Sequence, residues 1–275
     1  FNIGYLNHSQ GNFARALDLY FQALKIRRGL GDERAIANNL NHIGMVYDEQ
    51  GNSTQALAFY HQSLEIHNRM ENQPGIARVL NNIGVVYDQQ GKPDSALYFY
   101  RQSLFMERDM GNTHGVASTL VNIGIIYTDR EEFGRARKYL TEALFLNREV
   151  DDPEGIAYCL RNLGQCALRA GQYAQALRLQ QEALAIAEGN QYASLIVQLY
   201  KGIASAHAGL GQWQQAYAFE AKYSALADSL FGAQRNAEVG RLQAQYEMEE
   251  RMQEKEARER AEAEAARERD NNQFL

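Results

Sequence analysis

The stretch NNIGVVYDQQGKPDSALYFY, residues 81–100, decides the fold of this chain. Residues 41–60 read NHIGMVYDEQGNSTQALAFY, and residues 121–140 read VNIGIIYTDREEFGRARKYL. Self-similarity at a fixed spacing of 40 residues indicates supersecondary units that stack on one another. We therefore expect a repeat architecture in which each unit buries its apolar face against the next.

Small residues mark the period along most of the chain. The first set is Gly4, Gly44, Gly84, Gly124 and Gly164, with Ala204 in the sixth unit. The second set is Gly11, Gly51, Gly91, Gly171 and Gly211, with Glu131 as the exception. A glycine inside a helix costs roughly 1 kcal/mol relative to alanine, so five glycines at one phase require a packing reason. We expect the glycines of the first set to let the two helices of a unit approach closely.

Each unit contains two apolar stretches with helical spacing. In the third unit the first stretch has Val79, Leu80, Ile83, Val86 and Tyr87 on one face. The second stretch has Ala96, Leu97, Tyr100 and Leu104 on one face. QQGKPD lies between them and is typical of a turn, because Gly91 can adopt positive φ and the following Pro and Asp suit a helix start.

The spacing resembles the tetratricopeptide repeat in a variant with a 40-residue period. The third unit carries the pattern as Ile83, Gly84, Tyr87, Gly91, Ala96, Tyr100 and Ser103. The resemblance implies an all-α fold, a right-handed α-solenoid of about six helix-turn-helix units, followed by a long charged helix. The expected array spans 1–230, with units near 1–30, 31–70, 71–110, 111–150, 151–190 and 191–230, of which the first is truncated.

The segment 231–275 has a different composition and is expected to form a charged connector helix. Glu and Arg recur there at i,i+4 spacing, which stabilises exposed helices. Two interpretations remain open, a solvated helix or a coiled coil that pairs with its twin in a homodimer. The join resembles the stalk of bacterial sensor histidine kinases and related signalling regulators. That resemblance implies a membrane span beyond Leu275, with the side of the membrane undetermined. Phe1 already lies inside the first helix of its unit, without the polar cap that ends a repeat array, so we expect a fragment of a longer protein.

Composition argues against several classes of function. The net charge of −6 disfavours nucleic-acid binding, which requires a basic surface. Cys159 and Cys166 are seven residues apart in one expected helix, too far for a mutual disulfide. The sequence contains no phosphate-binding glycine motif and no metal-ligand spacing. We therefore expect neither an enzyme nor a cofactor.

Asparagine recurs in the first helix of the units, although it is a poor helix former. An amide can both donate to and accept from the backbone of an extended peptide. Kinesin light chains and related repeat adaptors, which this spacing resembles, hold peptides in this way. The alternative is that the amides only bond neighbouring helices and stabilise the stack. The candidate residues of a partner-binding groove are Asn41, Arg78, Asn81, Asn82, Asp88, Asn122, Tyr158, Arg161, Asn162 and Lys201.

These observations favour a protein-interaction module that binds a peptide or protein segment in a concave groove. The resemblance implies that it is the input part of a larger bacterial signalling protein. Two alternatives stay open: a scaffold for self-assembly or dimerisation, and a sensor of a short signal peptide or small molecule.

Overall fold

The computed structural model describes residues 2–230, and twelve helices occupy that range. Eleven have defined ends: α1 (Asn2–Ser9), α2 (Phe13–Leu30), α3 (Glu33–Glu49), α4 (Ser53–Arg69), α5 (Gln73–Gln89), α6 (Pro93–Asp109), α7 (Thr113–Asp129), α8 (Phe133–Glu149), α9 (Pro153–Arg169), α10 (Tyr173–Gly189) and α11 (Ala193–Gly209). Residues 213–230 are also helical. The predicted connector helix at 231–275, and the dimer expected through it, lie outside the described residues.

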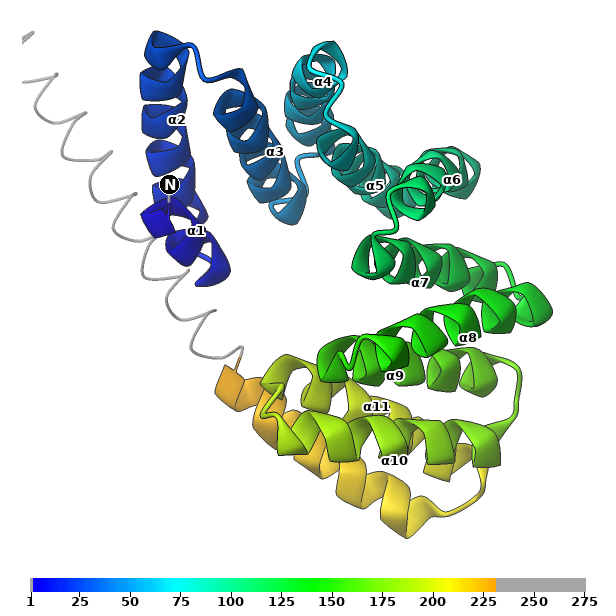
Figure 1. The fold of residues 1–275 in the computed structure, drawn as a ribbon. Helices are drawn as coiled ribbons and strands as arrows, with labels where there is room; N and C mark the ends of the chain where they lie inside the picture. The colour runs from blue at the N-terminus through cyan, green and yellow to red at the C-terminus, as the bar shows by residue number, and fades with distance from the viewer. Residues whose placement is uncertain (1, 231–275) are drawn as a thin grey trace, which may run out of the picture. The chain divides into compact units, whose positions relative to one another are not determined.

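The chain divides into two compact units, Phe1–Tyr223 and Ser224–Leu275. In the first unit each odd-numbered helix packs on the even-numbered helix that follows it, which forms a helical hairpin. The odd-numbered helices from α3 to α11 also contact one another in succession. Figure 1 shows α3, α5, α7 and α9 on the inner side of this stack, with α4, α6, α8 and α10 outside. The predicted all-α stack of about six hairpins is confirmed.

The turns between helices follow a period of their own. Positive φ occurs at every twentieth residue, namely at Gly11, Gly31, Gly51, Glu71, Gly91, Gly111, Glu131, Asp151, Gly171, Gln191 and Gly211. The helices from α3 to α11 are all 17 residues long, so each turn has three residues. Side chains at the helix starts reinforce these breaks; Asn72, for example, accepts a hydrogen bond from the Gly75 N–H. The expected positive φ at Gly91 is confirmed.

The glycines of the first periodic set have a packing role inside the hairpins. A Cβ atom on Gly84 would lie 2.5 Å from the ring of Tyr100, and one on Gly44 would lie 2.6 Å from the ring of Tyr60. Both rings come from the second helix of the same hairpin and are fully buried. The absence of a side chain on the first helix therefore makes room for a whole aromatic ring from the second.

A second aromatic contact closes the α5–α6 and α7–α8 hairpins near their turns. Tyr87 stacks on Phe99 with ring centroids 5.3 Å apart, and Tyr127 stacks on Tyr139 at 5.5 Å. The two helices of a hairpin are also joined by a hydrogen bond. The hydroxyl of Ser103 on α6 donates to the Ala77 carbonyl on α5 at 2.8 Å. The small-residue position of the repeat therefore also ties the second helix of the hairpin to the first.

The two cysteines of the chain lie on one helix, as expected. Cys159 and Cys166 are both buried free thiols on α9, so the prediction that they do not form a disulfide is confirmed. Burial raises the pKa of the Cys159 thiol to about 11, which keeps it protonated at neutral pH.

In the part of the chain that the structure describes, no helix has the length and hydrophobicity needed to cross a membrane.

We predict that Gly84→Ala lowers the free energy of unfolding by about 1–3 kcal/mol, because its Cβ would overlap the buried Tyr100 ring. Urea denaturation followed by circular dichroism measures the change. Gly134→Ala is the matched control, because Gly134 is exposed on α8 and a Cβ there meets open space. That variant should gain up to about 1 kcal/mol. If Gly84→Ala left the free energy of unfolding unchanged, the packing role of Gly84 would be contradicted.

We predict that Glu131→Gly raises the free energy of unfolding by about 0.5–1 kcal/mol. Glu131 adopts φ 61° on an exposed turn, where a side chain costs more than the added flexibility of glycine. Thermal unfolding measures the gain. Gln62→Gly, on the exposed face of α4, should instead lose about 1 kcal/mol, and equal effects of the two variants would refute the strain argument.

Candidate functional site

The ten predicted groove residues all lie on odd-numbered helices. Asn41 is on α3; Arg78, Asn81, Asn82 and Asp88 are on α5; Asn122 is on α7; Tyr158, Arg161 and Asn162 are on α9; and Lys201 is on α11. These helices form the inner side of the stack (Figure 1). The fold therefore spreads the ten residues over five helices, and Asn41 and Asn162 are buried.

The asparagines form a ladder between successive helices. Asn82 Nδ2 donates to Asn41 Oδ1 at 2.9 Å, which joins α5 to α3. Asn122 Nδ2 donates to Asn81 Oδ1 at 3.2 Å, which joins α7 to α5. The two donors of this ladder are Asn82 and Asn122, and the side-chain carbonyl oxygen of each has no partner among the described residues. One half of the amide thus stabilises the stack, while the other half can accept a hydrogen bond from a ligand.

The ladder ends at α9, where the polar groups have a different arrangement. Asn162 is buried, and its Nδ2 donates to the Tyr158 carbonyl within the same helix at 2.8 Å. The guanidinium of Arg161 lies over the Tyr158 ring, 5.3 Å from its centroid. The Tyr158 side chain remains 41% exposed. This part of the inner surface therefore presents a cationic group and an aromatic ring.

A pocket of about 260 Å³ opens between α7 and α9. Ala117 and Val121 supply its apolar wall, and the amides of Asn122 and Asn147 supply polar groups. Its remaining lining residues are His114, Ser118, Asp152, Glu154, Gly155 and Tyr158. Asp152 caps α9 by accepting from the Gly155 N–H, so the start of this helix forms one edge of the pocket.

Two of the predicted residues, Asn122 and Tyr158, line this pocket. Four further lining residues were not predicted from the sequence and lie in the turns and at the adjoining helix ends: His114, Asn147, Asp152 and Glu154. The predicted positions were counted along the first helix of each unit, whereas Asn147 belongs to the second helix, α8. Its burial and its hydrogen bond from Nδ2 to Cys159 Sγ become visible only in the structure.

The other predicted residues lie elsewhere on the inner side. Arg78 is exposed on α5. Burial and, next, the charge of Arg78 lower the pKa of His42 to about 4, so this histidine is neutral at pH 7. The ammonium of Lys201 lies 5.8 Å from the centroid of the Tyr223 ring. Neither Arg78 nor Lys201 lines the pocket between α7 and α9.

Carboxylates on α3 and α5 carry unusual pKa values. Burial, assisted by the charge of Glu49, raises the pKa of Asp48 to about 6, and its Oδ1 has no hydrogen-bond partner among the described residues. Burial and the charge of Asp129 raise the pKa of Asp88. Asp129 in turn pairs with Arg169 of the next unit. The inner surface near α3 and α5 therefore holds acidic groups that are partly shielded from water.

The arrangement suits recognition better than catalysis. Among the described residues, no three His, Cys, Asp or Glu side chains come together in a way that could hold a metal ion. The surface instead offers amide donors and acceptors, one exposed aromatic ring and charges of both signs. Such groups can pair with the backbone and side chains of an extended chain.

Comparison with known proteins identifies the repeat. The family model described as "Tetratricopeptide repeat" matches residues 1–69, 35–106 and 115–189. The matching model is that of a repeat unit and not of a catalytic domain. No curated protein sequence matches the chain.

Three solved structures illustrate the likeness in fold. BtubC (BKLC) from P. vanneervenii is 19% identical with a TM-score of 0.68, over 80% of this chain and 92% of that one. A Rap protein complexed with Competence and Sporulation Factor is 16% identical with a TM-score of 0.60, over 83% and 74%. The Signal Transduction ATPase with Numerous Domains protein with a tetratricopeptide repeat sensor from Pyrococcus horikoshii is 16% identical with a TM-score of 0.69, over 83% of this chain. The match spans only 35% of the Pyrococcus chain.

We predict that Asp48→Asn stabilises the protein above about pH 6 and has no effect below about pH 4. The folded state raises the Asp48 pKa from 3.8 to about 6, so native stability falls as pH rises through that window. Because the side chain is half-buried, water screens the effect, and we expect about 1 kcal/mol near neutral pH. Urea titrations at several pH values measure it. Asp109→Asn, on the exposed face of α6, is the control, and a pH-independent gain at Asp48 would contradict the assignment.

Proposed function

Because the chain belongs to the tetratricopeptide repeat family, whose arrays are typically protein-interaction modules, we propose that its inner surface binds an extended peptide or protein segment. The contact centres on α5, α7 and α9. The observation that carries this proposal is the pocket between α7 and α9, where amides, an apolar wall and the exposed Tyr158 ring converge.

The chemistry of this surface fits a peptide. Asn82 and Asn122 keep carbonyl oxygens that can accept from peptide N–H groups while their Nδ2 atoms bond the neighbouring helix. The pocket volume of about 260 Å³ suits one or two ligand side chains. Tyr158 and Arg161 can then cover an apolar or acidic group of the ligand, since aromatic and arginine side chains contribute most at binding surfaces.

We place this binding at the input end of a signalling protein. Two neighbours in fold support that role, the Rap protein crystallised with Competence and Sporulation Factor and the Pyrococcus ATPase with a repeat sensor. The peptide complex of the Rap protein favours a short signal peptide as the ligand class. The link to a bacterial histidine kinase rests on the resemblance of the segment after residue 230, which lies outside the described residues.

The test is a selection of short random peptides on the wild-type protein, followed by affinity measurements on the recovered peptides by fluorescence anisotropy. We expect a class of peptides whose affinity falls about tenfold, or ~1.4 kcal/mol, with each of Asn122→Ala and Tyr158→Ala. Lys138→Ala, on the exposed face of α8, is the matched control and should leave that class unaffected.

Asn82→Ala separates the two roles of the ladder. It removes the bond to Asn41, so we expect a lower unfolding temperature together with weaker peptide binding. If the Asn82, Asn122 and Asn162 variants lower stability while every selected peptide keeps its affinity, the amides serve only the stack and the proposal is wrong.

A further inference from the structure

A larger pocket lies on the outer side of the stack, between α6 and α8. Its volume is about 690 Å³, and its lining residues are Asp94, Leu97, Tyr98, Arg101, Gln102, Phe105, Met106, Tyr127, Arg130 and Arg135. Tyr98, Arg101 and Phe105 share one face of α6, because they are spaced three and four residues apart. The two aromatic side chains are 62% and 73% exposed. This face combines a cation with apolar surface that the fold itself does not bury.

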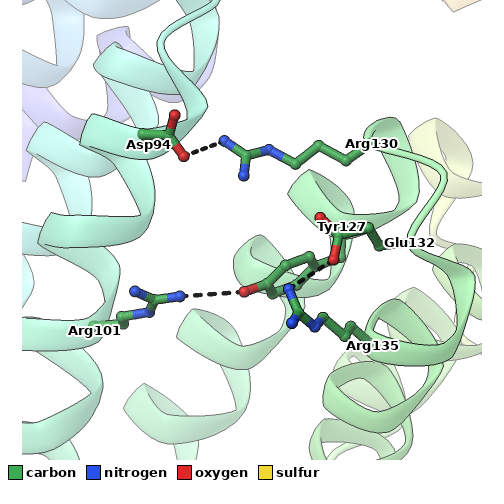
Figure 2. Close-up of polar contacts among 6 residues, drawn as sticks. All are labelled: Asp94, Arg101, Tyr127, Arg130, Glu132 and Arg135. Atoms are coloured by element: carbon green, nitrogen blue, oxygen red, sulfur yellow. Dashed lines mark hydrogen bonds and ion pairs between the residues drawn. The ribbon is translucent and has the colours of Figure 1, made fainter.

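The cation at the centre of the pocket is held in place by a buried tyrosine. Arg101 donates to the Tyr127 hydroxyl at 3.2 Å. Tyr127 is itself fixed, because its ring stacks on Tyr139 and the Arg135 guanidinium lies 5.5 Å from its centroid. Figure 2 shows Arg101 reaching from α6 toward Tyr127, with the Asp94–Arg130 pair spanning the same two units. The remaining N–H groups of Arg101 are therefore oriented before any ligand arrives.

Arg101 has no carboxylate partner among the described residues, unlike the two other arginines of the pocket. Arg130 pairs with Asp94, and Arg135 pairs with Glu132. Among the described residues no carboxylate lies within ion-pair distance of Arg101. Asp94 is 89% exposed, so its pair with Arg130 contributes little to stability and can exchange with another acid. The pocket thus has three arginines and one aspartate in a chain of net charge −6.

The repeat provides an internal control for what the fold requires. The positions of Arg101, Arg130 and Arg135 carry His61, Gln90 and Ser95 one unit earlier, and Thr141, Ala170 and Gln175 one unit later. Those interfaces stack in the same way without arginine at these three positions. The stacking interface has its own ion pair elsewhere, between Arg108 and Glu142. Stacking of the units therefore does not require arginine at these three positions.

We propose that this outer pocket, lined by Tyr98, Arg101, Phe105, Arg130 and Arg135, is a second binding site and takes an acidic segment of a partner protein that also carries an aromatic or aliphatic side chain. A carboxylate of the segment bonds Arg101 with two parallel hydrogen bonds and draws on the charge of Arg130. The neighbouring apolar side chain packs between Tyr98 and Phe105. The site is distinct from the inner groove, because most of its lining residues lie on α6 and it shares no lining residue with the other pocket.

The lining favours an acidic peptide over a phosphate. Asp94 faces the pocket and repels a doubly charged anion more strongly than a single carboxylate. Half of the lining side chains are apolar or aromatic, and such surface contributes nothing to binding of an isolated phosphate. The face from Tyr98 to Phe105 extends about 10 Å along α6, which matches several residues of an extended segment.

The experiment repeats the selection of short random peptides on wild-type protein, now with removal of every peptide that binds Arg101→Glu. This step discards ligands of the inner groove, because that surface is unchanged in the variant. We expect the recovered peptides to combine Asp or Glu with an aromatic or aliphatic residue. Their affinity should fall at least tenfold on Arg101→Glu and severalfold on Phe105→Ala.

Three controls decide the outcome. His61→Glu makes the same change one unit earlier and should leave binding intact, as should Tyr158→Ala in the inner groove. Thermal unfolding of Arg101→Glu and Arg101→Gln verifies that both variants fold. Recovery of no Arg101-dependent peptide, or of peptides without acidic residues, would overturn the proposal. Arg101-dependent binding of inorganic phosphate in place of peptides would overturn it in favour of a small-anion site.

Discussion

The contact between a glycine on the first helix of a hairpin and a large side chain on the second sets the geometry of the stack. At Gly44 and Gly84 the ring of Tyr60 or Tyr100 occupies the space in which a Cβ would stand. The ring is buried against backbone, so the two helices are held at one separation and one rotation. In the later units Leu140 and Gln180 take the place of the ring against Gly124 and Gly164. The hairpin survives this exchange because the glycine and the buried partner remain.

Once the hairpin geometry is set, the turns make it periodic. A positive φ at every twentieth residue ends one helix and redirects the chain, so successive helices have equal length and equivalent packing. Equal helices in turn bring the same positions of neighbouring units together. The bonds Asn82–Asn41 and Asn122–Asn81, each between residues 41 apart in sequence, are a direct consequence of that regularity. The polar ladder on the inner side therefore depends on the aromatic packing between the helices.

The two proposed binding surfaces use positions that the repeat does not need. On the inner side these are the exposed Tyr158, the free halves of the asparagine amides and the helix start at Asp152. On the outer side they are Arg101 and the exposed Phe105. Both surfaces are built from side chains of adjacent units, so neither exists in a single hairpin. A stack can in this way carry two separate recognition sites on the two faces of one scaffold.

The sequence by itself determined the fold class, the number of hairpins, the turn at Gly91 and the packing role of Gly84. These follow from a local sequence pattern that recurs every 40 residues. It also named Asn122 and Tyr158, which lie at a fixed offset on the inner helices. It did not reveal His114, Asn147 or Asp152, since these reach the same pocket from a turn and from a different helix. The sequence did not show which asparagine amides pair with each other. It also gave no sign of the hydrogen bond between Arg101 and Tyr127, which are 26 residues apart. Only the tertiary structure decided those pairings, because they depend on how one hairpin is rotated against the next.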